Sequence, residues 1–245
     1  MRTYGLVGYP LTHSFSQKYF TEKFKQLGIA DTEYLNFSIP AIAELEGIIA
    51  RYPGLSGFNI TIPHKKNILP YLQEATDAVK RMGACNCVLI NNGKLKGYNT
   101  DVVGFEQSLQ PFLRTDHRSA LILGTGGAAA AVEYVLQNLG IEYHFVSRNP
   151  APGQFSYAEL NEAIMHQNKL IINTSPLGQF PKEVEFPDIP YQHIGSGHHL
   201  FDLIYNPEET AFLQKGKAGG ATTQNGYEML VLQAEESWRI WNTRQ

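Results

Sequence analysis

Apolar and polar residues follow two distinct periods along the first hundred positions. Runs with a period of two, typical of half-buried strands, alternate with longer runs that have the period of amphipathic helices. Glycine and proline end several of these runs, as at Gly28 and Pro53. We predict strands at residues 3–9, 32–39 and 55–62, a hairpin at 85–101 that turns at Asn92–Gly93, and helices at 16–29, 40–52 and 75–83. This order of elements predicts an α/β layer with a largely parallel sheet.

The runs beyond residue 102 are more continuously apolar. Segments such as "ALIL" at 120–123 are typical of strands in a parallel sheet that is covered on both faces. The segment 179–199 is rich in Pro and Gly and is predicted to be a surface loop. Further strands are predicted at 116–124, 141–148, 169–175 and 198–205, a glycine-rich turn with a helix at 125–140, and a last helix at 226–241.

Composition narrows the classes of protein to which the chain can belong. Its 245 residues suit one large domain or two modest ones. The net charge is -3 with no basic block, so a nucleic-acid partner is not expected. No apolar run approaches the ~20 residues of a membrane span, and the amino terminus does not resemble a signal peptide. Cys85 and Cys87 have no nearby His, so we expect buried, reduced thiols in a cytoplasmic protein and no metal site.

A glycine-rich turn joins a predicted strand to a predicted helix in "LGTGGAAAA". Gly124, Gly126 and Ala129 match the spacing G-x-G-x-x-G/A, and Gly127 is a further glycine within it. Glycines at these places let a pyrophosphate approach the backbone N–H groups at the start of a helix, where the helix dipole favours negative charge. The motif therefore predicts a dinucleotide site; a tight turn without a ligand is the alternative.

The end of the next strand bears on the choice of cofactor. NAD enzymes usually place a carboxylate there to bind the ribose 2′-hydroxyl, whereas NADP enzymes offer an arginine. This chain has Ser147, Arg148 and Asn149, with no carboxylate among them. Arg148 can pair with a 2′-phosphate or stack on adenine, so NADP is favoured. A solvated surface arginine is the alternative.

Neutral polar residues gather where predicted strands of the first unit end. Hydroxyls and amides both donate and accept hydrogen bonds, so such a set suits a polyhydroxylated ligand. The set comprises Ser14, Ser16, Asn59, Thr61, Asn86, Asn99 and Thr100, accompanied by Lys65 and Asp101. In "GFNITIPHKK", alternation places Asn59 and Thr61 on one side of a strand and Ile60 and Ile62 on the other. The polar side is either a solvated edge or the floor of a site.

Purely structural roles are the alternative for these candidates and for two further polar residues, Tyr205 and Gln233. They are helix capping for Ser14, Ser16 and Asp101, turn chemistry for Asn86, a surface position for Lys65, a core aromatic for Tyr205 and a solvent-facing position for Gln233.

Seven motifs occur in order along the chain. They are "NITIPHK", "GACN", "GYNTDVVGF", "GTGGAAAA", "NTSPLG", "DLIYNPEETAFL" and "NGYEMLVLQA". With them, the chain from about residue 5 to residue 236 resembles the shikimate dehydrogenase family. The resemblance implies an α/β fold of two domains with a cleft between them. The substrate domain would comprise residues 1–101 plus 224–245, and the Rossmann-type NADP-binding domain residues 102–223.

The resemblance also implies an activity and a set of functional residues. The activity is the NADPH-dependent, reversible reduction of 3-dehydroshikimate to shikimate, a step of chorismate and aromatic amino-acid biosynthesis. The implied catalytic pair is Lys65 and Asp101. The implied substrate-binding residues are Ser14, Ser16, Thr61, Asn86, Tyr205 and Gln233, with Asn59 beside them. The implied cofactor-binding residues are Gly124, Thr125, Gly126, Gly127, Ala128, Ser147, Arg148, Asn149, Thr174, Ser175, Leu203 and Gly226, together with Asp77.

The chain departs from the family pattern at a few positions. Gln17 stands where the family usually has Pro, Cys87 where it has Thr, and Gln179 where it has Met. Asn149 takes the place of a Thr in the adenosine loop, which removes a hydroxyl from the 2′-phosphate site and leaves tolerance of NAD open. None of these departures falls on Lys65 or Asp101.

Two other functions stay open from sequence. One is a dehydrogenase of the same fold that acts on quinate or another cyclic hydroxy acid. The other is a cofactor-sensing regulator without turnover, which would be expected to have lost Lys65 or Asp101. The expected partners are small molecules, with no nucleic acid or membrane, and the chain is expected to be a monomer or a homodimer. The protonation state of Lys65 also stays open, because Asp101 would favour its charged form whereas the reverse reaction needs a neutral amine.

Overall fold

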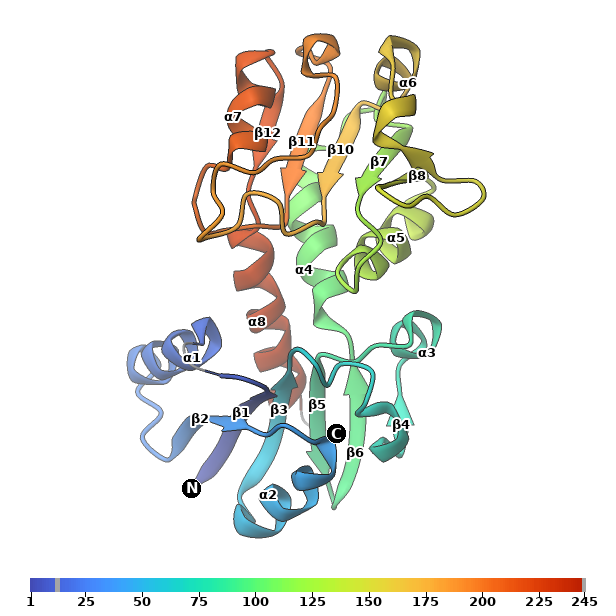
Figure 1. Cartoon of the computed structure of the whole chain (residues 1–245). Coiled ribbons are helices and arrows are strands. Elements are labelled where there is room, and N and C mark those ends of the chain that lie inside the picture. Colours follow the sequence, from blue (N-terminus) through green and yellow to red (C-terminus); the bar gives the residue numbers. More distant parts are fainter. Residues whose placement is uncertain (12–13, 244–245) are drawn as a thin grey trace. The chain divides into compact units, whose positions relative to one another are not determined.

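The computed structural model of the chain describes residues 1–11 and 14–243 and divides into two compact units (Figure 1). Unit 1 comprises Met1–Thr100 and Ala234–Gln245, and unit 2 comprises Asp101–Gln233. Residues 224–233, which the sequence assigns to the first domain, lie in unit 2. They do so because β12 (Thr222–Gln224) pairs with β11 (His199–Asp202), and because the backbone of the following helix lies against Gly104 at Met229.

Unit 1 contains a mixed sheet of six strands in the order β2-β1-β3-β5-β6-β4. β1 is parallel to β2 and β3, whereas β5 is antiparallel to β3 and β6. The predicted turn at Asn92–Gly93 is confirmed, since both residues have positive φ. The strands are β1 (Arg2–Gly8), β2 (Thr32–Ser38), β3 (Leu55–Ile60), β4 (Glu74–Ala75), β5 (Cys87–Asn91) and β6 (Lys94–Tyr98). The helices are α1 (Phe15–Gln26), α2 (Leu45–Arg51), α3 (Asp77–Met82) and the last part of α8 (Tyr227–Asn242).

The two faces of this sheet are covered by different helices. Phe58 and Ile60 of β3 belong to a core cluster that includes residues of α2 and α3. Tyr4 of β1 and Cys87 of β5 belong to a second cluster with aromatic residues of α1 and α8. Cys85 lies in the first cluster, so the two cysteines are free and buried on opposite faces rather than on one face. Each face is therefore a separate apolar layer.

The strand predicted at 55–62 is two residues too long. β3 ends at Ile60, which is buried, and the Ile62 side chain is 73% exposed. The alternation of "NITI" therefore holds only as far as Ile60. Beyond it, the chain turns at Thr61, whose carbonyl accepts a hydrogen bond from the His64 N–H (2.9 Å). The end of the strand is set by this turn rather than by the apolar pattern.

Unit 2 contains a sheet of six parallel strands in the order β12-β11-β10-β7-β8-β9 (Figure 1). The sequence predicts such a sheet, and β7, β10 and β11 are buried along their whole length. The order reverses between β7 and β10, which is where dinucleotide folds bind their ligand. The further strands are β7 (Ser119–Leu123), β8 (Glu142–Ser147), β9 (Phe155–Ser156) and β10 (Leu170–Asn173). The helices are α4 (Thr100–Leu109), α5 (Ala129–Asn138), α6 (Glu162–Gln167) and α7 (Ala211–Ala218), followed by the first part of α8.

The segment 179–199 is not wholly at the surface. Ile189 and Ile194 are buried in the core cluster of unit 2, beside Phe212 of α7. The opposite face of this sheet packs on α4, where the rings of Phe105 and Phe201 lie 5.2 Å apart. Among the described residues, no helix has both the length and the apolar character needed to cross a membrane.

Gly57 provides a test of packing in unit 1. The Trp241 indole donates from Nε1 to the Val88 carbonyl (3.0 Å), and a Cβ on Gly57 would lie against the indole and 2.8 Å from that carbonyl oxygen. We therefore expect Gly57→Ala to lower the free energy of unfolding by about 1–3 kcal/mol through overpacking. The matched control is Gly47→Ala in α2, where a Cβ meets no atom within 4 Å. It should raise stability by about 0.5–1 kcal/mol. The two variants are compared by their midpoints of urea unfolding. Equal changes in the two midpoints would contradict the packing argument.

Candidate active site

The topology of unit 1 brings the predicted substrate residues to one edge of its sheet. β1, β3 and β6 run in the same direction, so their carboxyl ends share this edge, and β5 begins there because it runs the other way. Ser14 follows β1, Thr61 and Lys65 follow β3, Thr100 follows β6, and Asn86 precedes β5. Ligands of α/β sheets bind at such edges.

Asn59 lies in a buried polar network just inside this edge. Its side chain is 5% exposed, and its Oδ1 accepts a hydrogen bond from the Tyr34 hydroxyl (2.9 Å). Its Nδ2 donates to the Ser237 hydroxyl (2.8 Å) and to the Asn86 carbonyl (3.3 Å). Both N–H donors of the amide are thus used by protein groups.

Asn86 is held by the residue that opens α4. The Thr100 N–H donates to Asn86 Oδ1 (2.6 Å), and Asn86 Nδ2 donates to the Thr100 hydroxyl (3.1 Å). Because a backbone donor fixes which side of the amide carries the oxygen, Asn86 has one orientation. An Nδ2 group has two protons, and the second is the one suited to a ligand hydroxyl.

Ser14 and Ser16 differ in their local roles. Ser14 is the N-cap of α1 and accepts a hydrogen bond from the Gln17 N–H (3.2 Å), so its capping role is real. Ser16 lies inside α1, and its side chain lowers the pKa of Tyr34. Burial nevertheless raises the pKa of Tyr34 well above its usual range, so Tyr34 is a neutral donor to Asn59. Both serines are half-buried, which leaves them accessible to a ligand.

The backbone of Lys65 is fixed while its side chain remains half-exposed. The Lys65 carbonyl accepts a hydrogen bond from the Cys85 N–H (2.8 Å), and the Thr61 N–H donates to the Val7 carbonyl (2.9 Å). Burial raises the pKa of Cys85 to about 11, so this thiol stays protonated beside the lysine. The backbone of Lys65 is therefore held by Cys85, two residues before β5, and the turn that leads to Lys65 is held by β1 through Thr61.

The remaining predicted polar residues are assigned to unit 2. Asp101 is the second residue of α4, so it lies within the first turn, where the helix dipole favours its charge, rather than at an N-cap. Tyr205 follows β11 and is 42% exposed, so it is not a core aromatic. Gln233 is 9% exposed and donates from Nε2 to the Leu230 carbonyl (2.9 Å), so it does not face solvent.

The predicted pyrophosphate loop joins β7 to α5 at the switch point of the unit 2 sheet. Gly124 has a φ of 106°, which favours glycine, and the Thr174 hydroxyl from the neighbouring strand donates to the Leu123 carbonyl (2.9 Å). Residues 125–128 are exposed, and a Cβ on Gly126 or Gly127 would meet no protein atom within 4 Å. This open cradle ends at Ala128, the N-cap of α5, which makes no side-chain capping bond. The loop therefore fits an anionic pyrophosphate.

The end of β8 fits a 2′-phosphate. Arg148 is exposed, and its charge lowers the pKa of Tyr157, although burial of Tyr157 has the larger, opposite effect. The Asn149 N–H donates to the Ser147 hydroxyl (3.2 Å), which shapes the turn. A cation and neutral polar groups thus stand where an NAD site would have a carboxylate.

Asp77 lies apart in sequence from the other predicted cofactor residues, and its assignment stays a prediction. It lies in α3 of unit 1, whereas the rest are in unit 2. Its side chain is 91% exposed and 3.8 Å from Lys80 Nζ. Its visible role is that of an acidic residue in the first turn of a helix.

Asp202 is a buried residue of unit 2 that the sequence did not single out. Its Oδ1 accepts hydrogen bonds from Asn173 Nδ2 (3.0 Å) and the Ile204 N–H (3.1 Å), and its Oδ2 from the Thr210 hydroxyl (2.6 Å). Asn173 Oδ1 in turn accepts from the Ser175 N–H (3.1 Å) and hydroxyl (2.7 Å). Asp202 thus fixes the loops that carry Ser175 and Tyr205. The only hint in the sequence is an acidic residue inside the apolar run "HLFDLI".

Leu203 and Gly226 are joined through the same loop. The Leu203 N–H donates to the Asn173 carbonyl (3.0 Å), and the Gly226 N–H donates to the Ile204 carbonyl (3.0 Å). A Cβ on Gly226 would fall onto the Leu203 carbonyl, so this close approach requires glycine.

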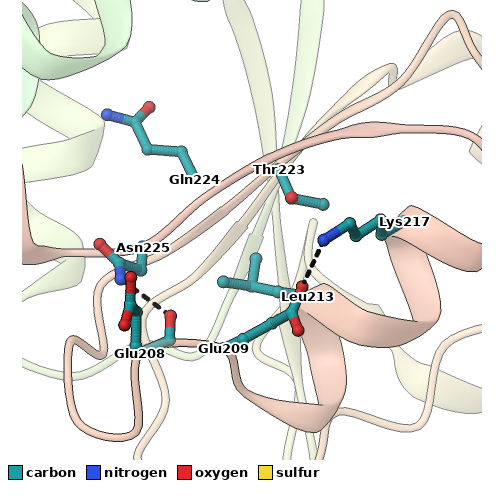
Figure 2. A pocket seen from close by; sticks show the side chains of 7 residues that line it. All are labelled: Glu208, Glu209, Leu213, Lys217, Thr223, Gln224 and Asn225. Carbon is teal, nitrogen blue, oxygen red and sulfur yellow. Dashed lines mark hydrogen bonds and ion pairs between the residues drawn. The ribbon is translucent and has the colours of Figure 1, made fainter.

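Figure 2 shows a separate pocket of about 410 Å³ in unit 2. Two of its charged groups form an ion pair, since Lys217 Nζ lies 3.0 Å from Glu209 Oε1. Asn225 Nδ2 donates to the Glu208 carbonyl (2.8 Å). The pocket is lined by Glu208, Glu209, Leu213, Lys217, Thr223, Gln224 and Asn225, and it includes none of the predicted site residues. Within the described part of the chain, no group of three or more His, Cys, Asp or Glu side chains could hold a metal ion.

Comparisons with known proteins agree on one family. Residues 6–88 match the family model described as the shikimate dehydrogenase substrate binding domain. The chain is 37% identical to shikimate dehydrogenase (NADP(+)) of Methanococcus maripaludis, over 98% of this chain and 91% of the relative. It is 28% identical to the structure of the Thermus thermophilus enzyme in complex with NADP(H) and shikimate, with a TM-score of 0.86 over 99% of this chain and 94% of that one. It is 25% identical to ligand-free 5-ketofructose reductase of Gluconobacter sp. strain CHM43, with a TM-score of 0.86 over 100% and 94%.

Asp202 and His199, both in β11, titrate in opposite senses. Burial raises the pKa of Asp202 to about 6, so the folded state holds a proton that the unfolded state has lost, and stability falls as pH rises from 4 to 6. Burial lowers the pKa of His199 to about 4, so the unfolded state holds the extra proton and stability rises over a similar range. In the wild type, the opposite contributions of Asp202 and His199 to the pH dependence of stability offset each other.

Asp202→Asn should remove only the first effect. The amide keeps an oxygen for Asn173 and Ile204 and can donate to Thr210. We expect the unfolding free energy of the variant, relative to wild type, to increase by up to about 3 kcal/mol between pH 4 and pH 7. Denaturant unfolding at several pH values measures this difference. A constant offset across that range would contradict the assigned titration.

Proposed function

Because the chain belongs to the shikimate dehydrogenase family, we infer that it catalyses the NADPH-dependent, reversible reduction of 3-dehydroshikimate to shikimate. This reaction is a step of chorismate and aromatic amino-acid biosynthesis. The inference rests on two structural features, one in each unit. Hydroxyl, amide and ammonium groups share one sheet edge in unit 1, and an open glycine cradle lies at the switch point of unit 2.

Unit 2 is the NADP-binding domain in this proposal, and unit 1 is the substrate domain. Gly124 to Ala128 would hold the pyrophosphate on backbone N–H groups, and Ser147, Arg148 and Asn149 would hold the adenosine 2′-phosphate. Thr174, Ser175, Leu203 and Gly226 would line the nicotinamide end. When bound, NADPH supplies the hydride for the ketone carbon.

The substrate is a ring that carries hydroxyls and a carboxylate. Ser14, Ser16, Thr61, Tyr205 and Gln233 are assigned to bind these groups, together with Asn86. Hydroxyls of the protein can donate to the carboxylate and can both donate to and accept from ring hydroxyls. The amide of Asn86, fixed by Thr100, offers a directed N–H donor.

Lys65 is assigned to proton transfer. Negative charge develops on the substrate oxygen as the ketone is reduced, and an ammonium group can stabilise that charge and donate the proton. In the reverse direction the amine of Lys65 accepts the proton from the hydroxyl. Asp101 is assigned as the second member of the catalytic pair.

A related substrate is the second candidate. The similarity to a 5-ketofructose reductase supports it, because that name describes a reaction at the carbonyl of a different polyhydroxylated molecule. A panel of shikimate, quinate and 5-ketofructose, each with NADP(H) and NAD(H), distinguishes these activities by absorbance at the nicotinamide band. A non-catalytic cofactor sensor is disfavoured because Lys65 and Asp101 are both present.

The cellular setting follows from the same reasoning. Two free, buried cysteines suit a reducing compartment, so we place the enzyme in the cytoplasm. It would act on small molecules as a monomer or a homodimer, without nucleic acid or membrane.

Lys65→Ala should lower kcat by at least ~100-fold, the usual scale for an acid–base group, with little change in the affinity for NADPH. Lys66→Ala is the matched control, since Lys66 is the adjacent lysine and is exposed. Steady-state rates with shikimate and NADP compare the two variants. A near-normal kcat in Lys65→Ala would refute its assignment.

Arg148→Ala should reduce the preference for NADPH over NADH by roughly 10- to 100-fold in kcat/KM, because a charge-assisted bond to the 2′-phosphate is lost. Arg118→Ala, at an exposed arginine beside the opposite end of the same sheet, is the control. An unchanged ratio of the two kcat/KM values in Arg148→Ala would show that another group selects the phosphate.

A further inference from the structure

We propose that Asn59 and Ser237 are positioning residues of the substrate site, which act through Ser16 and Asn86 rather than by touching substrate. The proposal rests on the proposed function. It concerns how the sheet edge of unit 1 keeps its ligand-binding groups in one orientation.

The bonding of Asn59 argues against direct contact with a ligand. Its two N–H donors are used by the Ser237 hydroxyl (2.8 Å) and the Asn86 carbonyl (3.3 Å), and its oxygen accepts from Tyr34 (2.9 Å). The side chain is also almost wholly buried. An amide in this state has no donor left for a substrate hydroxyl.

Ser237 joins two branches of the network. Its hydroxyl accepts from Asn59 and shares a 3.3 Å hydrogen bond with the Thr100 hydroxyl. One branch runs from Asn59 to the Tyr34 hydroxyl, whose pKa is raised by burial and lowered, to a smaller extent, by the neighbouring Ser16. The other runs from Thr100 to both polar atoms of Asn86. A serine on α8 thus connects residues of β2 and β3 with Asn86, which precedes β5, and Thr100, which follows β6.

The helix that carries Ser237 is firmly placed on the sheet. Trp241, one turn later on the same face, stacks on Tyr4 with ring centroids 4.7 Å apart and donates to the Val88 carbonyl (3.0 Å). Ser237 is completely buried, so water cannot replace its hydroxyl without a rearrangement. Its position is therefore imposed by packing, and the polar groups around it adjust to that position.

Removal of the hydroxyl should loosen both branches. Asn59 Nδ2 would lose its shorter bond and keep the longer one to Asn86, and the Thr100 hydroxyl would lose a neighbour that sets its direction. A buried donor left without a partner favours rearrangement of its side chain. The side chains of Ser16 and Asn86 would then populate several orientations, and only some of these orientations would suit the ligand.

The test uses the full-length enzyme with Ser237→Ala, Tyr34→Phe and the double variant. We expect each single variant to raise the KM for shikimate by roughly 3- to 10-fold, the scale of one lost hydrogen bond. The KM for NADP and kcat should stay within about twofold, since neither the cofactor loop nor Lys65 is altered. The double variant should match the worse single variant, because both substitutions act through Asn59.

Ser119→Ala controls for the loss of a buried serine. Ser119 is also buried and donates to Asn168 Oδ1 (2.6 Å), but it opens β7 in unit 2, away from the proposed cofactor loop at the other end of that strand. It should lower thermal stability without a change in the KM for shikimate. If Ser237→Ala does not fold, Tyr34→Phe alone still tests the same link.

The possible results distinguish a failure of the proposed function from a failure of the positioning role alone. A wild-type enzyme that does not oxidise shikimate would overturn the proposed function and this proposal together. A wild type that oxidises shikimate, with single variants unchanged in KM or with fold-changes that multiply in the double variant, would overturn only the positioning role. Equal rises in the KM for shikimate and for NADP would indicate a general structural effect and would also overturn it.

Discussion

A buried amide must satisfy its donors and acceptors inside the protein, and the Asn59 side chain does so between two layers of unit 1. Its partners come from β2, from the residue before β5 and from α8. An unpaired polar group at this depth would cost about 1–3 kcal/mol, so those elements are held in one arrangement. The same bonds fix the residues at the sheet edge where we assign the substrate. Stability and ligand recognition therefore depend on one set of contacts.

Unit 2 uses a charged group for a similar purpose. The Asp202 carboxylate gathers an amide from the last residue of β10, and a backbone N–H and a hydroxyl from the segment between β11 and α7. The cost of burying its charge appears as a raised pKa, whereas the neutral network of unit 1 has no such dependence on pH. The two units thus hold their loops by different chemistry, with a buried carboxyl group in unit 2 and neutral amides and hydroxyls in unit 1.

Much of the fold can be predicted from the sequence because local patterns determine it. The apolar runs of unit 2, the Asn92–Gly93 turn and the glycine-rich loop follow from nearest-neighbour rules. The strand end at Ile60 could not be predicted, since Ile62 continues the apolar alternation and only the turn at Thr61 breaks it. The family could be identified because seven of its motifs occur in order along the chain.

Residues whose roles arise from packing were harder to find. Ser237 lies in "EESW", an ordinary polar stretch of an amphipathic helix, and its partners are distant in sequence. Nothing local distinguishes it from a surface serine. Asp202 was visible as an acidic residue in an apolar run, but its partners could be identified only once β10 and β11 were seen side by side.

The course of α8 has a consequence for synthesis of the protein. Residues 234–242 of this helix complete the core of unit 1, and the bond between Asn59 and Ser237 joins positions 178 residues apart. Unit 2 is a continuous insertion that is fully translated before this segment emerges. A growing chain can therefore close the inserted unit first, while the face of the unit 1 sheet that α1 and α8 share is covered by α1 alone. The part of α8 that completes this cover is translated after the whole of unit 2.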